Sequence, residues 1–100
     1  MNNLKIKKVR RKLDRLDEKL LLVIKKRTNL VDEIIKLKKN KKEIVDKKRI
    51  NFILKKIKNK SIELKIDPFI TVSIWKEMIK VFIKYEYKKF KKKNLLAVWR

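Results

Sequence analysis

Apolar residues recur along residues 4–38 at alternating steps of four and three, which is the pattern of one long amphipathic helix. The seam consists of nine positions, and eight of them are apolar: Val9, Leu13, Leu16, Leu20, Val23, Arg27, Leu30, Ile34 and Leu37. Neither Gly nor Pro interrupts it. We therefore expect a continuous helix about 50 Å long.

A helix of that length is too long for the domain that carries it. The chain has 100 residues, and a compact domain of this size has a radius of gyration near ~13 Å. We expect the helix to extend beyond its own domain and to bury its seam against a second chain. The predicted fold is all-α, with one long and two shorter helices per chain, in an intertwined homodimer.

Two further helices follow a charged loop at residues 38–43. The first is expected at about 45–59, with Asp46 in its first turn, where a carboxylate suits the helix dipole. Residues 59–67 form a connector, and Asp67 then caps a helix that has Pro68 at its first position. We divide the chain into a helical domain, residues 1–90, and a basic tail with an apolar end, residues 91–100.

The amino-acid composition limits the kinds of catalytic and metal site that the chain can form. The chain has no Gly, Cys or His, which excludes a Gly-rich phosphate loop, a thiolate or imidazole catalyst and a thiolate metal site. We expect no metal and no cofactor. No apolar run approaches the ~20 residues of a membrane span, and the N-terminus lacks the apolar core of a signal peptide. We expect a cytoplasmic protein with no membrane partner.

The net charge of +22 suggests an anionic partner. However, 27 of the 33 basic residues are Lys, and Ile and Asn are also abundant, as an AT-rich genome would produce. The six arginines are the more informative cations: Arg10, Arg11, Arg15, Arg27, Arg49 and Arg100.

Four ionisable residues lie on or beside apolar helix faces. Arg27 interrupts the seam, and Lys38 follows 11 residues later, almost three whole turns, on nearly the same face. Glu86 interrupts the stripe of the third helix, and Arg49 lies four residues before Ile53 in the second. Taken singly, each has a structural reading. Arg27 could fix the register of a coiled coil, Lys38 could be a solvated helix-end lysine, Glu86 could pair with Arg27, and Arg49 could lie on the surface.

Taken together, these residues predict a pocket for a small, multiply anionic ligand. Burying two or three cations beside one carboxyl group is costly unless an anion neutralises them. Arginine binds carboxylates through two parallel hydrogen bonds. A site with arginines but no nucleophile or metal suits a reaction that needs only shape and electrostatics.

The segment VRRKLDRLDEKLLLVIKKRTNLVDEIIKLKK, residues 9–39, followed by IVDKKR, residues 44–49, closely resembles the all-helical chorismate mutases. The likeness extends more loosely along the third helix to about Phe90, and residues 91–100 lie outside it. The resemblance implies an intertwined helical homodimer that rearranges chorismate, a dianion, to prephenate. This pericyclic reaction has no covalent intermediate and no cofactor.

The resemblance also implies roles for individual residues. Arg27 and Arg49 would bind the substrate carboxylates, and Arg10 would reach into the partner's site. Lys38 would donate a hydrogen bond to the ether oxygen, whose negative charge grows as the C–O bond breaks. Asp46 would contact the ring hydroxyl through its backbone.

Three positions depart from the family pattern. Ile50 stands where Glu usually binds the C4 hydroxyl, and Phe82 stands at a position that is usually Ser. Glu86 replaces the Gln that donates to the ether oxygen. An ionised Glu86 would hinder the reaction, whereas a protonated one would donate as Gln does. The apolar residue at position 50 and the aromatic one at 82 also resemble the isochorismate pyruvate-lyases of this fold, which form salicylate.

A basic helical dimer that binds nucleic acid is a further reading of the charge. Against it, the lysines are spread along the whole chain, and no recognised DNA-binding motif is present. We therefore favour the chorismate mutase reading over the lyase and the nucleic-acid alternatives.

Overall fold

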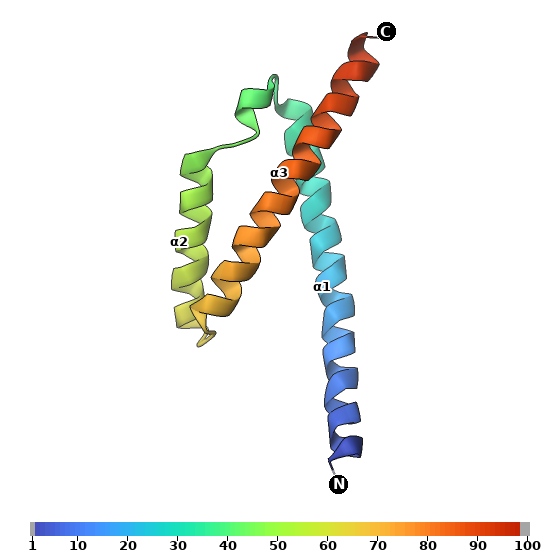
Figure 1. Cartoon of the computed structure of the whole chain (residues 1–100), viewed down its shortest axis with the longest axis vertical. Helices are drawn as coiled ribbons and strands as arrows, with labels where there is room; N and C mark the ends of the chain where they lie inside the picture. Colours follow the sequence, from blue (N-terminus) through green and yellow to red (C-terminus); the bar gives the residue numbers. More distant parts are fainter. Residues whose placement is uncertain (1, 99–100) are drawn as a thin grey trace. The chain divides into compact units, whose positions relative to one another are not determined.

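The structure is a computed structural model that describes the backbone of residues 2–98 and the side chains of residues 2–93. It contains α1 (Asn3–Leu37), α2 (Lys47–Glu63) and α3 (Pro68–Val98), with a short 3-10 helix, η1 (Lys41–Glu43), between α1 and α2 (Figure 1). The residues it describes include no strand. The predicted all-α architecture of one long helix and two others is confirmed, although α3, at 31 residues, is nearly as long as the 35-residue α1.

The chain forms two compact units, one up to Ile34 and one from Ile35 onward. The first unit consists of a single helix, α1 up to Ile34. The predicted span of the whole helix, 4–38, agrees with the observed one to within a residue at each end. A single helix has no interior, and seam residues such as Leu13, Leu16 and Leu20 are 53%, 59% and 55% exposed.

The second unit contains the end of α1, η1, α2 and α3. Its buried apolar side chains are Ile35, Ile44 and Phe90, which are 4%, 5% and 2% exposed. They come from the end of α1, the segment after η1 and the later part of α3. This small core therefore joins segments that are far apart in the sequence.

The start of α2 differs from the prediction. Asp46 precedes the helix as its N-cap, in an extended conformation, and its Oδ1 accepts a hydrogen bond from the Arg49 backbone N–H at 3.0 Å. From this capping position the carboxylate binds one of the N–H groups of the first turn that have no partner within the helix. Asp46 therefore stabilises the start of α2 through a hydrogen bond as well as through its charge.

The end of α2 also differs, because the helix runs to Glu63 and takes up part of the predicted connector. Residues 59–63 contain no Gly or Pro that would stop it. The helix ends in a Schellman motif, in which Ile66 N–H donates to the Ser61 carbonyl at 2.9 Å and Lys65 N–H to that of Ile62 at 3.1 Å. Lys65 has a φ of 59°, a conformation that usually favours glycine.

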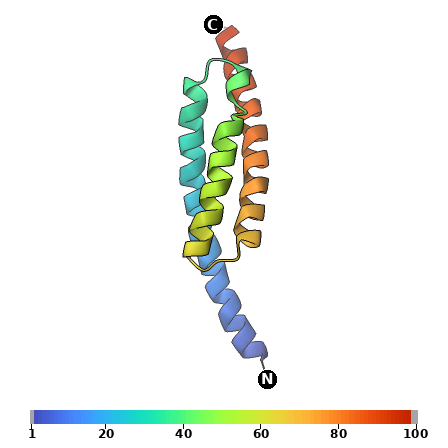
Figure 2. The ribbon, with the colours of Figure 1, turned by 90° about the vertical axis from the view of Figure 1, so that its left-hand side faces the viewer.

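The start of α3 is as predicted. Asp67 Oδ1 accepts a hydrogen bond from Phe69 N–H at 2.9 Å, and Pro68 is the first helical residue. The short turn brings α3 back along α2, so the two helices lie side by side (Figures 1 and 2). Near the turn, the buried Ser61 hydroxyl lies 2.6 Å from that of Thr71. This contact fixes the two helices to each other at one end.

The helix α3 continues through residues 91–98, the segment that we assigned to a tail. No break in the helix therefore marks the boundary at residue 90. Among the residues that the structure describes, no helix has both the length and the apolar composition of a membrane-spanning segment.

Candidate functional site

The centre of the candidate site is an ion pair between Lys38 and Glu86. Lys38 Nζ lies 3.5 Å from Glu86 Oε2, and the two side chains are only 18% and 12% exposed. Lys38 directly follows α1, and Glu86 lies in the second half of α3, 48 residues away. The structure therefore brings together the two residues that we predicted to be catalytic.

One single-residue reading is corrected by this contact. Lys38 is not a solvated helix-end lysine, because its side chain is mostly covered and its ammonium is paired. Glu86 pairs with Lys38 within the second unit; the reading that pairs it with Arg27, a residue of the first unit, stays a prediction. Lys38 and Glu86 belong to the same compact unit, so the fold of that unit holds them together.

Phe82 lies one helical turn before Glu86 and contacts Tyr85 edge to face. The two ring centroids are 6.1 Å apart and the rings are inclined by 76°. Both side chains are half-buried. Sequence analysis identified Phe82 by its register with Glu86, but it did not identify Tyr85, because an aromatic beside an apolar stripe is unremarkable.

Three other candidates lie at the start of α2. Ile50 is half-buried, and its N–H donates to the Asp46 carbonyl at 3.0 Å. Arg49 is exposed, with its guanidinium carbon 5.4 Å from the centre of the Phe52 ring. Across the side chains of residues 2–93, no hydrogen bond or ion pair joins Asp46 or Arg49 to the Lys38–Glu86 pair.

The remaining candidates, Arg10 and Arg27, lie on α1 in the first unit. Arg10 is exposed and Arg27 is half-buried. The other candidate residues belong to the second unit. A site that combines them with these two arginines therefore stays a prediction.

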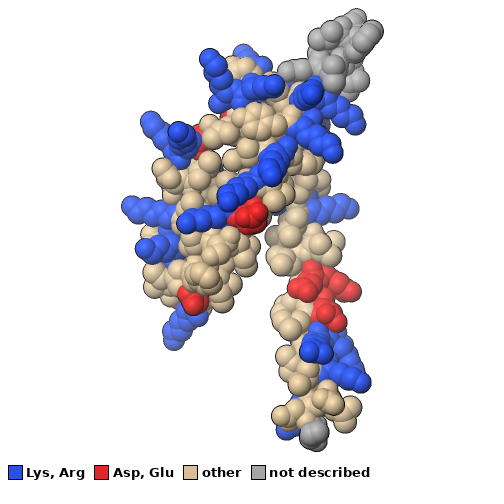
Figure 3. Space-filling view, viewed as in Figure 1, with Lys and Arg blue, Asp and Glu red and all other residues tan. Residues whose placement is uncertain are grey.

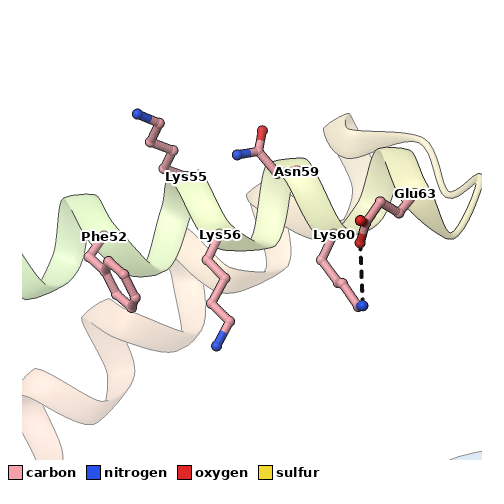
Figure 4. A pocket seen from close by; sticks show the side chains of 6 residues that line it. All are labelled: Phe52, Lys55, Lys56, Asn59, Lys60 and Glu63. Atoms are coloured by element: carbon pink, nitrogen blue, oxygen red, sulfur yellow. Dashed lines mark ion pairs between the residues drawn. The ribbon is translucent and has the colours of Figure 1, made fainter.

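Basic side chains cover much of the face of α2 and α3 that Figure 3 shows. A hollow of about 590 Å³ lies along α2 and is lined by Phe52, Lys55, Lys56, Asn59, Lys60 and Glu63 (Figure 4). None of the candidate residues lines it, and Lys60 and Glu63 pair with each other at 3.3 Å. We therefore place the candidate site at Lys38 and Glu86 and not in this hollow.

The described part of the chain contains no group of three or more His, Cys, Asp or Glu residues that could hold a metal ion. The chemistry that the site offers is thus that of a partly buried ammonium and a carboxyl group. An ammonium can donate three hydrogen bonds, of which the contact with Glu86 uses one. A carboxyl group donates only when it is protonated.

Of the comparisons with known proteins, the one with family models gives a match. No curated protein and no solved structure gives a significant match. The family model for chorismate mutase type II matches residues 9–87. This span includes all eight candidate residues and most of the three helices. The chain, with its three-helix fold, therefore belongs to the chorismate mutase type II family.

Proposed function

We propose that this chain is a chorismate mutase, which converts chorismate to prephenate. The observation that carries the proposal is the Lys38–Glu86 pair, which lies within the span matched by the family model. By the resemblance described above, its two residues correspond to those with which the family contacts the ether oxygen of chorismate. A partly buried ammonium at that point stabilises negative charge more strongly than an exposed one would.

The reaction is a single rearrangement in which one C–O bond breaks as one C–C bond forms. Arg27 and Arg49 bind the two carboxylates of the substrate and hold its reacting ends close together. Lys38 donates a hydrogen bond to the ether oxygen as that atom becomes negative. No group of the protein forms a covalent bond with the substrate, in keeping with the lack of His and Cys.

Glu86 supports this step in its protonated form. An ionised carboxylate at the ether oxygen would repel the charge that develops there, whereas a protonated one donates a second hydrogen bond. Without substrate, the Lys38 ammonium lies beside the Glu86 carboxylate. During the reaction, the ether oxygen of the substrate becomes the negatively charged group beside this ammonium. Glu86 is therefore proposed to act as a second donor to the ether oxygen, the role that Gln has in the family.

The proposal includes a homodimer in which Arg10 enters the partner's site. The supporting observation is the exposed seam of α1, a helix that has no core of its own within its unit. Arg10 precedes Arg27 by 17 residues, which places it about 100° away around the helix. It is therefore directed away from the site to which Arg27 contributes.

Isochorismate pyruvate-lyase activity is the second candidate, because two residues favour it. Ile50 offers no polar contact to the C4 hydroxyl of chorismate, and isochorismate carries its hydroxyl at C2 instead. Phe82 packs against Tyr85 where the mutases usually have Ser. This reaction would release salicylate and pyruvate from isochorismate.

Incubation of the purified protein with each substrate separates the candidates. We expect prephenate from chorismate; salicylate and pyruvate from isochorismate would favour the lyase. Lys38→Met should lower kcat by about 10²-fold or more, the usual effect of removing one such donor. Lys39→Met is the matched control, since Lys39 is the exposed neighbouring lysine. Tight nucleic-acid binding at physiological salt without turnover of either substrate would contradict the proposal.

A further inference from the structure

Lys93, on α3, binds the end of α1 with all of its donors. Its Nζ donates to the backbone carbonyls of Ile35, Lys36 and Lys38 at 3.3, 3.0 and 3.2 Å. The last carbonyls of a helix have no partner within the helix and carry its negative dipole end. An ammonium has three donors, so these three contacts use its full capacity.

The Lys93 ammonium also lies over an aromatic ring. Its Nζ lies 5.7 Å from the centre of the Phe90 ring, and Phe90 is 2% exposed. A cation near an aromatic face is attracted to the ring, and the methylene stem can pack on apolar surface. Lys93 is half-buried, whereas the adjacent Lys91 and Lys92 are exposed. Lys93 is therefore part of the packed structure.

Glu86, Phe90 and Lys93 follow one another at steps of four and three and so share one face of α3. This face holds Lys38 at two points. The Lys38 ammonium pairs with Glu86 at 3.5 Å, and the Lys38 carbonyl accepts a hydrogen bond from Lys93 at 3.2 Å. One surface of α3 thereby fixes both the backbone and the side-chain end of the same lysine.

We propose that Lys93 is a positioning residue for catalysis: by binding the last carbonyls of α1, it sets the place from which Lys38 donates to the substrate. This inference rests on the proposed function. A shift of about 1 Å in a catalytic donor can lower a rate by as much as ~10²-fold. Lys38 follows the last residue of α1, and helix ends fray, so contacts such as those of Lys93 help to fix its position.

The first test is the kinetics of Lys93→Met, which keeps an unbranched side chain but removes all three donors. We expect kcat to fall about 10-fold while KM for chorismate changes less than about twofold, since Lys38 acts mainly in the transition state. Lys92→Met removes the same charge from the adjacent exposed position and should leave kcat unchanged. Lys93→Arg, which keeps the charge and several donors, should restore most of kcat. A Lys93→Met enzyme with wild-type kcat would overturn the inference, as would an equal loss in Lys92→Met.

The second test needs no turnover. The NMR signal of the Glu86 carboxyl carbon reports on its contact with Lys38, and we expect it to shift in Lys93→Met but not in Lys92→Met. If the wild type turns over neither substrate, the proposed function fails, and this signal still decides whether Lys93 positions Lys38. An unmoved signal overturns the positioning role even if kcat falls, because the loss would then have another cause.

Discussion

The exposed seam of α1 provides a quantitative test of the homodimer. Leu16 lies near the middle of the seam in the first unit and is 59% exposed. Leu22 lies on the same helix and is 60% exposed, but it is about 120° away from Leu16 around the axis. Leu16→Lys and Leu22→Lys therefore make the same chemical change on and off the seam.

The expected size of the effect follows from the exposed fraction. Complete burial of a leucine side chain is worth about 1.5–3 kcal/mol, and Leu16 has 59% of its surface left to bury. Covering it contributes about 1–2 kcal/mol per chain, and a symmetric dimer loses this amount twice. Since 1.4 kcal/mol is a factor of ten, Leu16→Lys should raise the dimer Kd by about 30- to 700-fold. Burial of the new ammonium would add to this loss.

Sedimentation velocity over a range of protein concentrations measures the dimer Kd, and chorismate turnover is assayed on the same samples. Activity should fall together with the dimer fraction, because in the proposed homodimer each site takes Arg10 from the other chain. Circular dichroism controls for loss of helix. The reasoning is refuted if Leu16→Lys dimerises as tightly as the wild type, or if Leu22→Lys weakens the dimer equally. A fully active monomer would refute the shared site in particular.

Three further predictions concern single positions. Glu86→Gln should keep activity in the chorismate assay, because the amide N–H can donate to the ether oxygen as the proposed role of Glu86 requires; an inactive Glu86→Gln enzyme would remove Glu86 from this role. Lys65→Gly should raise the free energy of unfolding in urea by about 0.5–1 kcal/mol, because glycine adopts a positive φ without a Cβ clash; a decrease would contradict the role of this turn. Asp46→Ala should lower the same quantity by about 1 kcal/mol through loss of the α2 cap, while Asp46→Asn should cost much less.

The elements that sequence could predict are those fixed by local patterns. The unbroken seam predicts α1 to within a residue, and the pair Asp67–Pro68 predicts the start of α3. The end of α2 had no such signal, since the residue that adopts the left-handed conformation there is Lys65 and not glycine. A lysine does not indicate a positive φ as a glycine would, so the helix was predicted to end at about residue 59 and not at Glu63.

In the candidate site, too, features set by local spacing could be predicted, whereas contacts between distant residues were harder to predict. The register of Glu86 with Phe82 and Phe90 could be read from the sequence, because it depends on spacing within one helix. The pairing with Lys38 joins residues 48 positions apart, and it could be expected only from unfavourable charges on apolar faces. Lys93 gave no signal, because its residue type is the commonest in the chain and its three acceptors are backbone carbonyls.

The location of Phe90 and Lys93 bears on how short this protein can be made. The span shared with the family ends at residue 87, and both residues lie beyond it. A polypeptide trimmed to the shared span would retain Glu86 and every other candidate residue, yet it would lose the ring and the ammonium that hold the end of α1. Such a minimal version would leave those carbonyls to water. On the proposed function, the smallest active version of this chain is therefore expected to extend beyond the span that the family model matches.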